Sequence, residues 1–196
     1  MYNAISKYYF LHIQPLTANL MSILARSLEQ ETIIACHRYG LDVVVYNPLA
    51  GGLFSGKIKS GEVPKEGRFS EQWGGGGAMY RKRYFKDATF DALKLVEEAA
   101  KKHNLTLLEI ALRWVVHHSA LKLANKGGND GVIIGVSSFE QLEGNIRDLE
   151  KGPLPEDVVK TLDEAWLIAK PTTPNYWHLD LEYKYDTQAA LFKAKP

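Results

Sequence analysis

The sequence predicts an α/β fold with parallel strands, which we interpret as the C-terminal part of a (β/α)8 barrel. Two apolar, β-branched runs, LDVVVY at 41–46 and GVIIGV at 131–136, have the length and composition of buried parallel strands. Helical segments alternate with them, as expected for parallel pairing through right-handed crossovers. Two strands alone do not make a stable sheet, and a complete barrel needs about 250 residues. We therefore expect strands 7 and 8 of a barrel with their helices, and we expect the N-terminal strands to be missing.

Composition indicates one globular domain and excludes several classes of partner. The chain has 196 residues, of which 45% are hydrophobic and 24% are charged. A net charge of +1 gives no electrostatic basis for binding nucleic acid or an anionic membrane, and no apolar run is long enough to span a bilayer. A single cysteine, Cys36, favours a reducing, cytoplasmic compartment, and we interpret it as a small buried hydrophobe rather than a nucleophile.

The remaining segments read mainly as helices. The first helix is predicted to begin near Thr17 and to continue to Gly40, with Leu20, Ile23, Leu24 and Leu28 at helical spacing. Further helices are expected over 87–104, from the capping residue Thr106 to about residue 118, and over 155–170. The adjacent pair His117-His118 points to different sides of a helix, so we interpret it as cations near a helix C-terminus rather than as a metal site.

A glycine-rich loop, YNPLAGGLFSGK at 46–57, follows the first strand directly. Pro48 ends the strand because it has no N–H for the ladder, and the glycines allow close approach of the backbone to a ligand. A buried strand that opens into such a loop is where α/β proteins usually hold ligands. The polar, glycine-rich residues 58–78 are predicted to form a long mobile loop of the kind that serves as a lid.

Two further segments have two interpretations each. Ser138 and Gln141 form a predicted capping box at the start of the helix after the second strand, which either binds phosphate or merely caps itself. The segment MYRKRYF at 79–85 is either a solvated helix start or an anion-binding wall that carries Tyr80 and Arg83.

Taken together, five ordered motifs resemble the aldo-keto reductases. They are YNPLAGGLFSGK, GRF at 67–69, MYRKRYF, LRW at 112–114 and IIGVSSFEQLEGN, and they are most similar to the aflatoxin-aldehyde and succinic-semialdehyde reductase branch. MYNA at the start resembles the end of that family's sixth strand, so the resemblance covers 1–5 and then roughly 26–176. We expect three segments: 1–25 with the strand-6 end and an unmatched insert, 26–170 with the C-terminal part of the reductase domain, and 171–196 as a tail.

The resemblance implies NADPH-dependent reduction of a small aldehyde or ketone. Tyr46 would stack on the nicotinamide, the loop after it would wrap the pyrophosphate, and the last motif would meet the adenosine and its 2′-phosphate. The implied cofactor-binding residues are Tyr46, Asn47, Pro48, Leu49, Ala50, Gly51, Gly52, Leu53, Gly56, Lys57, Arg68, Gly135, Ser137, Ser138, Gln141 and Asn145. Tyr80 and Arg83 would line the substrate pocket and hold an acidic group.

The departures from the family pattern concern the chemistry. The family's catalytic Asp, Tyr, Lys and His lie on the earlier strands, so no catalytic residue can be assigned here and we expect little or no reductase activity. Relatives often carry a polar residue at the position of Gly144, some carry a substrate-binding arginine near His178, and some carry arginine in place of Gln141. The alternatives are a non-catalytic NADP-binding module, as in the potassium-channel β subunits, and a truncated product without function. The resemblance also implies a homodimer of the intact protein, and we expect no metal.

Overall fold

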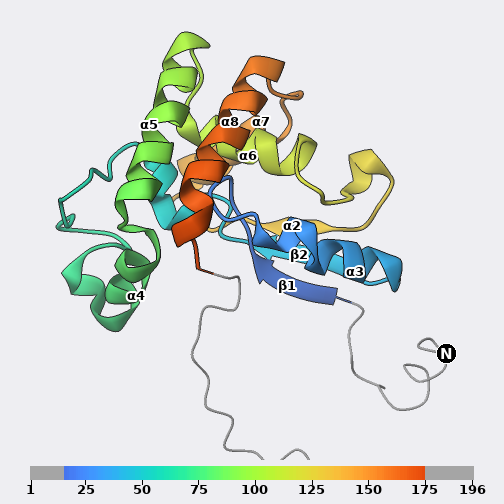
Figure 1. The fold of residues 1–196 in the computed structure, drawn as a ribbon, viewed down its shortest axis with the longest axis horizontal. Coiled ribbons are helices and arrows are strands. Elements are labelled where there is room, and N and C mark those ends of the chain that lie inside the picture. Colours follow the sequence, from blue (N-terminus) through green and yellow to red (C-terminus); the bar gives the residue numbers. More distant parts are fainter. Residues whose placement is uncertain (1–15, 175–196) are drawn as a thin grey trace, which may run out of the picture.

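The computed structural model describes residues 16–174, which are organised around a three-stranded parallel sheet (Figure 1). The strands are β1 (Leu16–Leu20), β2 (Asp42–Tyr46) and β3 (Gly131–Ile133), in the order β1-β2-β3. Tyr46 of the central strand is in register with Leu20 on one side and Ile133 on the other. The carboxyl ends of all three strands therefore meet at one edge of the sheet. The strand predicted over 41–46 is confirmed, whereas the strand predicted over 131–136 is shorter.

β1 contradicts the helix that was predicted from Thr17. Residues 16–20 are extended and pair with β2, and helical structure begins only at α2 (Ser27–Gln30) and α3 (Thr32–Arg38). Between strand and helix the chain turns sharply, with backbone hydrogen bonds in both directions between Ser22 and Ala25. The apolar spacing was misleading because a strand end, a turn and a short helix all contribute buried side chains to the same core.

Asp130, just before β3, joins three elements. Its carboxylate accepts hydrogen bonds from the backbone N–H of Val43 on β2 at 2.7 Å and of Lys122 at 2.6 Å, and it lies 2.8 Å from Nε2 of His37 on α3. The residue is buried, so these partners replace the water that the carboxylate loses on folding. This arrangement holds the start of β3 against β2 and sets the position of the chain that leaves β3.

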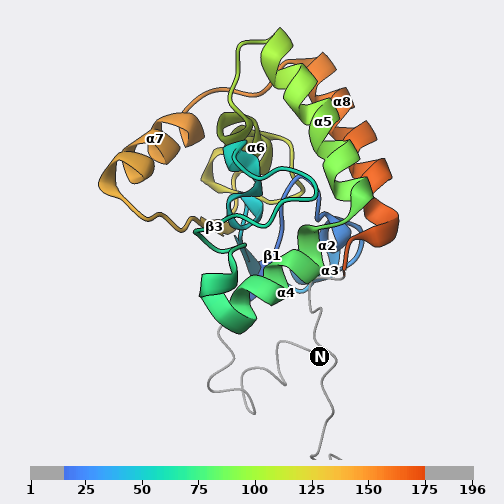
Figure 2. The same cartoon turned by 90° about the vertical axis from the view of Figure 1, so that its left-hand side faces the viewer.

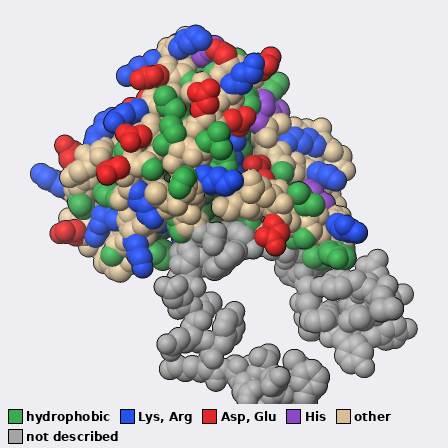
Figure 3. Space-filling model, viewed as in Figure 1, with side chains coloured by type: hydrophobic (Ala, Val, Ile, Leu, Met, Phe, Trp, Pro, Cys, Tyr) green, Lys and Arg blue, Asp and Glu red, His purple; other side chains and the backbone are tan. Residues whose placement is uncertain are grey.

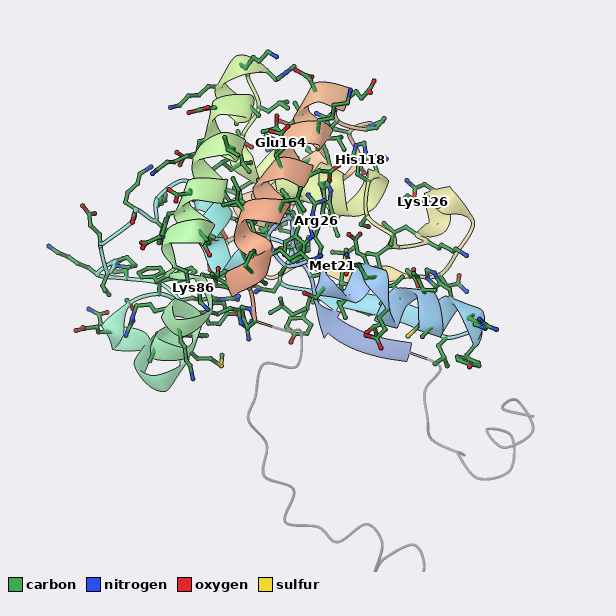
Figure 4. All side chains as sticks on the ribbon, viewed as in Figure 1. Met21, Arg26, Lys86, His118, Lys126 and Glu164 are labelled. Atoms are coloured by element: carbon green, nitrogen blue, oxygen red, sulfur yellow. The ribbon has the colours of Figure 1, made fainter. Side chains whose placement is uncertain are left out.

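Two long helices, α5 (Asp87–Lys102) and α8 (Glu156–Ala169), lie side by side in both ribbon views (Figures 1 and 2). They are antiparallel, because Lys102 at the end of α5 pairs with Asp157 at the start of α8 at 2.7 Å. At the opposite end Lys86 Nζ, labelled in Figure 4, donates to the Thr172 carbonyl at 2.7 Å within the short 3₁₀ turn η4 (Lys170–Thr172). Both helices were predicted from the sequence, and the structure confirms them. Their apolar faces form much of the core.

α6 (Leu107–His117) is the most deeply buried helix of the described chain. Its predicted N-cap is confirmed, since the Thr106 hydroxyl accepts from the Glu109 N–H at 3.0 Å. Trp114 on α6 lies under the guanidinium of Arg26, 4.4 Å from its ring centroid. Arg26 lies beside α8 near the middle of the molecule (Figure 4), where it also donates to the Leu162 carbonyl and pairs with Asp163. One arginine thus connects the N-terminal turn to two helices.

The glycine run Gly74–Gly77 belongs to a helix, which corrects the prediction of a continuous loop over 58–78. After the 3₁₀ turn η2 (Glu71–Trp73), α4 (Gly74–Tyr84) begins within the glycines. Close packing explains them: a Cβ on Gly77 would lie 2.1 Å from the Ser70 carbonyl oxygen, and one on Gly76 would lie 2.7 Å from the Trp73 ring. Tertiary contact here overrides the low helix propensity of glycine.

α7 (Phe139–Leu149) stands at one side of the molecule, reached by the chain that leaves β3 (Figure 2). Its side chains Phe139 and Ile146 are 68% and 43% exposed, so its apolar stripe is only partly covered. Two further 3₁₀ segments are η1 (Ala50–Ser55) and η3 (Ala124–Lys126). Acidic and basic side chains are interspersed over the face in Figure 3. Among the helices of residues 16–174, none combines the length and apolarity needed to cross a membrane.

Candidate functional site

A pocket with a volume of about 650 Å³ lies at the carboxyl ends of β2 and β3. This is the size of pockets that hold drug-sized ligands and cofactors. The wall is built from the loop after β2, the turn at Gly67, one side chain of α4, one of α6, and the chain from β3 into α7. The lining residues are Tyr46, Asn47, Pro48, Leu49, Gly51, Gly52, Ser55, Lys57, Gly67, Arg68, Tyr80, Leu108, Ile133, Gly135, Ser137, Gln141 and Asn145.

The loop after β2 has a left-handed backbone over several residues. The φ angles are +66° at Asn47, +50° at Ala50, +70° at Gly51 and +102° at Gly52. A non-glycine residue at such an angle is strained, and strained backbone of this kind concentrates at ligand sites. The Asn47 side chain stabilises the turn, because its Oδ1 accepts a hydrogen bond from the Gly51 N–H at 2.6 Å.

Tyr80 covers this loop from α4. A Cβ on Gly51 would lie 2.3 Å from Cε1 of the Tyr80 ring, so the ring rests directly on the glycine. Phe69 and Trp73 meet Tyr80 edge to face, each with ring centroids 5.7 Å apart. The absence of a side chain at position 51 is therefore what lets the aromatic wall close on the loop.

The pocket is electropositive. Lys57 and Arg68 are its two charged lining residues, and the lining within residues 16–174 contains no Asp or Glu. Arg68 also lies near Gly135 on the opposite wall, where a Cβ would be 3.3 Å from Nη2. Two cations, hydroxyl and amide side chains and a glycine-rich backbone form a donor set that suits a phosphate-bearing ligand.

The start of α7 caps itself. The Ser138 hydroxyl accepts a hydrogen bond from the Gln141 N–H at 3.3 Å, as in a capping box. In a complete capping box the Gln141 side chain would accept from the N–H of Ser138. Here its Oε1 accepts from the N–H of Ser137 instead. The pKa of the Glu140 carboxyl is lowered, first by its own backbone N–H and then by Ser138. Part of the donor capacity of this helix start is thus used within the protein, and Gln141, Ser137 and the buried Asn145 are the groups that face the pocket.

Most of the predicted cofactor residues come together in this pocket, and a few do not. The structure brings into one lining Tyr46, Asn47, Pro48, Leu49, Gly51, Gly52, Lys57, Arg68, Gly135, Ser137, Gln141, Asn145 and the predicted substrate residue Tyr80. Ala50 and Leu53 are fully buried in the core, and Gly56 ends η1 with φ +75° outside the lining. Ser138 serves as the helix cap.

Arg83, the second predicted substrate residue, does not reach the pocket. It is 7% exposed, and it lines a small separate hollow together with Tyr84 and Thr173. Its guanidinium lies 5.7 Å from the centroid of the Tyr80 ring and 5.9 Å from that of Tyr84. Arg83 therefore lies behind the aromatic wall rather than on it.

Four lining residues were not anticipated from the sequence: Ser55, Gly67, Leu108 and Ile133. Ser55 and Gly67 are neighbours of predicted residues within or beside the motifs, so proximity alone could have suggested them. Ile133 ends β3 and is 53% exposed. Leu108 comes from α6 with no sequence signal, because only the tertiary fold brings that helix to the loop.

His117, His118 and Cys36 lie outside the pocket lining. His118 accepts a hydrogen bond from the Leu154 N–H at 2.9 Å, and burial lowers its pKa, which corrects its interpretation as a cation at the helix end. His117 Nε2 lies 2.7 Å from the Lys151 carbonyl oxygen. Cys36 is a buried thiol. Within the described part of the chain, no group of three or more His, Cys, Asp or Glu side chains is arranged to hold a metal ion.

Comparison with known proteins assigns the family. The family model described as "Aldo/keto reductase family" matches residues 13–167. The chain belongs to the aldo/keto reductase family. The match includes β1 and the turn after it, so the family similarity begins before the boundary expected at residue 26. The segment 1–5, expected to resemble the end of a sixth strand, lies outside the described residues.

Curated relatives place this aldo/keto reductase chain near the aflatoxin-aldehyde branch, as the motifs indicated. An aldo-keto reductase of Pseudocercospora fijiensis is 42% identical over 158 residues, which cover 80% of this chain and 52% of that protein. Aflatoxin B1 aldehyde reductase member 2 of Rattus norvegicus is 39% identical over 160 residues, which cover 78% and 42%. The chain thus spans about half the length of the curated relatives it matches.

Solved aldo-keto reductases share the fold. Aldo-keto reductase AKR11C1 from Bacillus halodurans, in its apo form, has a TM-score of 0.52 and 24% identity over 83% of this chain and 47% of its own. The glycerol dehydrogenase AKR11B4 from Gluconobacter oxydans has a TM-score of 0.52 and 17% identity over 90% and 48%. The fold is therefore that of the (β/α)8 reductases, of which this chain matches about half.

Proposed function

We propose that this chain is the cofactor-binding part of an NADPH-dependent aldo-keto reductase that acts on a small aldehyde or ketone. The observation that carries the proposal is the electropositive pocket of about 650 Å³, whose lining of glycine backbone, Lys57 and Arg68 contains no carboxylate. A dinucleotide that carries several phosphates needs such surroundings. The holo form of AKR11C1 from Bacillus halodurans, which has the same TM-score of 0.52 as the apo form, is a further reason to look for a cofactor here.

In this proposal each wall of the pocket meets a different part of the cofactor. Tyr46, at the carboxyl end of the central strand, would lie against the nicotinamide, and the glycine loop with Lys57 would meet the pyrophosphate. Ser137, Gln141 and Asn145 would meet the adenosine and its 2′-phosphate. When bound, the cofactor would supply a hydride to the carbonyl carbon of the substrate.

The same proposal assigns the three strands to positions in the barrel. β1, β2 and β3 would be strands 6, 7 and 8, because β1 lies next to β2 in parallel and the pocket follows β2 and β3. The phosphate site of (β/α)8 enzymes often lies after strands 7 and 8. Leu16–Leu20 would then take the place that was expected for residues 1–5.

Binding of NADPH tests the proposal directly. Isothermal titration of the purified 196-residue chain should give saturable binding, and Lys57→Ala should weaken it about tenfold, the effect of one charge-assisted hydrogen bond. Lys59→Ala is the matched control, because Lys59 lies outside the lining and pairs with Glu97 at 3.6 Å. An unmodified chain that takes up no NADPH, or equal losses in the two variants, would refute the proposal.

The chain alone is expected to show little or no turnover. Reduction needs an acid that protonates the carbonyl oxygen, and the family's acid cannot be assigned to a residue of this chain. The assay is NADPH consumption with 4-nitrobenzaldehyde, with an intact aldo-keto reductase as the reference. Turnover comparable with that of the reference would show that a residue of this chain supplies the proton.

A second candidate function is a non-catalytic NADP-binding module. It is favoured by the same combination of a pocket suited to the cofactor and no assignable acid, and retained NADPH binding without turnover for any carbonyl tested would support it. A cytoplasmic location and a homodimer of the intact protein also belong to the proposal. Imaging of a tagged chain and sedimentation of the intact protein test these two expectations.

A further inference from the structure

The glycine loop is anchored by a hydrogen bond from outside itself. Asn47 stands at the end of β2 with φ +66°, and its side-chain oxygen accepts from the Gly51 N–H. This leaves the amide nitrogen Nδ2 facing the other way, where it donates to the hydroxyl of Tyr84 at 2.8 Å. A continuous path of two hydrogen bonds therefore runs from Tyr84 through Asn47 to Gly51.

Tyr84 is a rigid anchor for this path. It is the last residue of α4 and is 3% exposed, with Phe69 and Tyr80 packed against its ring at centroid distances of 6.1 and 6.2 Å. Burial raises the pKa of its hydroxyl, so the oxygen remains a neutral phenol that accepts from Asn47. Its neighbour on the same helix, Tyr80, lines the pocket and rests on Gly51. α4 thus touches the loop twice, once through the Tyr80 ring and once through the Tyr84 hydroxyl.

We propose that Tyr84 is a positioning residue for the pocket: through Asn47 it holds the loop in the left-handed conformation that forms the wall. Asn47 at φ +66° and Ala50 at φ +50° store strain that would relax if the side chain of Asn47 were free to turn. The Tyr84 hydroxyl prevents this by fixing the amide, and the amide in turn fixes Gly51. α4 and the loop therefore move as one unit, so the wall that carries Tyr80 and the wall that carries the glycines keep their spacing.

Hydrogen exchange in the chain without added cofactor tests the positioning role by itself. In Tyr84→Phe, which retains the buried ring, the backbone amides of Asn47 and of residues 49–52 should exchange about tenfold faster than in the unmodified chain, since one hydrogen bond is typically worth about a factor of ten. Asn47→Ala, which breaks the path from the other side, should accelerate the same amides. Tyr39→Phe is the control for removal of a hydroxyl, because Tyr39 is 52% exposed at the C-terminal cap of α3 and lies outside the pocket lining.

The outcome is decided by where exchange accelerates. Faster exchange confined to the amides of Asn47 and residues 49–52 in both variants supports the positioning role. Unchanged exchange at Gly51 in Tyr84→Phe overturns it, and so does acceleration spread evenly over the whole chain, because that result would mean general loss of stability.

Cofactor affinity gives a second readout, which rests on the proposed function. Tyr84→Phe should weaken NADPH binding about tenfold, and it should cause no further loss in an Asn47→Ala background, because both changes break one path. Additive losses would overturn the path through Asn47. If the unmodified chain does not bind NADPH, the proposed function fails, whereas the exchange experiment still decides whether Tyr84 positions the loop.

Discussion

At the scale of single residues, Gly51 shows how one missing side chain shapes the pocket. It combines φ +70° with the ring of Tyr80 at contact distance, so any Cβ is both strained and obstructed. We expect Gly51→Ala to lower the free energy of unfolding by about 1–2 kcal/mol through backbone strain and also to displace Tyr80, with loss of NADPH binding. Chemical denaturation and titration with NADPH measure the two effects.

Gly40→Ala is the matched control for that change. Gly40 has the same φ of +70°, but a Cβ there would meet no atom within 4 Å. It lies beyond α3, outside the pocket lining. This variant should show the loss in stability with unchanged affinity. Equal affinities in Gly51→Ala and Gly40→Ala would contradict the role assigned to the contact with Tyr80.

His118 gives stability a specific pH dependence. Burial, followed by the nearby charges of His117, Lys126 and Arg113, lowers its pKa in the folded state below the ordinary value of about 6.5. Above pH 6.5 His118 is mainly neutral in both the folded and the unfolded chain. As the pH falls through 6.5 the unfolded chain takes up the proton first, so the contribution of His118 to stability is lost.

The variant His118→Gln tests this dependence. Glutamine retains an oxygen that can accept from the Leu154 N–H but does not titrate. We expect urea unfolding to show a smaller loss of stability between about pH 7.5 and 5 in the variant than in the unmodified chain. Identical pH profiles would mean that the ring does not remain a neutral acceptor in the folded state.

Four of the 11 residues of α4 are glycines, which have low helix propensity, and these glycines are not equivalent. A Cβ on Gly75 would meet no atom within 4 Å, and its φ lies outside the left-handed range, so Gly75→Ala should stabilise the chain by about 0.5–1 kcal/mol. Gly77→Ala should destabilise it, because the Cβ would lie 2.1 Å from the Ser70 carbonyl oxygen. Thermal unfolding compares the melting temperatures of the two variants with that of the unmodified chain. A higher melting temperature in both variants would show that α4 is not packed as described.

Arg26 connects elements that are far apart in the sequence. Its guanidinium donates to the Ile23 and Leu162 carbonyls at 2.8 Å each and covers the Trp114 ring. We expect Arg26→Met to lower the free energy of unfolding by about 2–4 kcal/mol, since the orphaned carbonyls are buried. Asp163→Ala should cost much less, because that partner is 59% exposed. Losses of equal size would place the stabilisation in the ion pair instead.

Helices and strands were predicted correctly where a single helix or strand carries a complete apolar pattern of its own. α5, α6 and α8 each have a full apolar stripe and recognisable ends, and β2 is a continuous run of β-branched residues, so all four were anticipated. β1 was mistaken for a helix because its apolar residues continue without a break into a turn and α2. The first part of α4 was missed because its four glycines predict a loop, although one of the two interpretations of residues 79–85 was a helix. Packing against Ser70 and Trp73 accounts for the glycines within that helix.

The pocket was predictable to the extent that it is built from contiguous motifs. The loop after β2 and the chain after β3 follow adjacent parallel strands, so their convergence at one edge of the sheet follows from topology. Arg83 was misplaced because its position one helical turn from Tyr80 does not say which side of the aromatic cluster it occupies. Leu108 and Tyr84 act from elements whose position relative to the loop only the tertiary structure gives.

For the whole molecule, the partly covered side at β3 and α7 is expected to govern association. Ile133, Val136, Phe139 and Ile146 are 39–68% exposed there, and β3 pairs on one side only within the described sheet. Exposed apolar surface next to an open strand edge promotes self-association. We expect Phe139→Ser with Ile146→Ser to lower the apparent mass in concentration-dependent gel filtration, without loss of helical circular dichroism.

Leu167→Ser with Ile168→Ser provides the control, since these α8 side chains are 66% and 39% exposed away from the sheet edge. A change in apparent mass that is equal in both double variants would assign association to exposed apolar area in general. A change in apparent mass confined to the α7 variant would assign association to the partly covered surface at β3 and α7.

The position of Trp73 gives the molecule a built-in optical probe. Its indole is 49% exposed and meets Tyr80 at the pocket wall, whereas Trp114 and Trp166 are 1% and 8% exposed in the core. Indole emission shifts to longer wavelength in water, so fluorescence collected at the long-wavelength edge of the emission should come mainly from Trp73 among these three. Its emission would then report, in stopped-flow mixing and without any attached dye, the arrival of a ligand at the pocket wall that carries Tyr80.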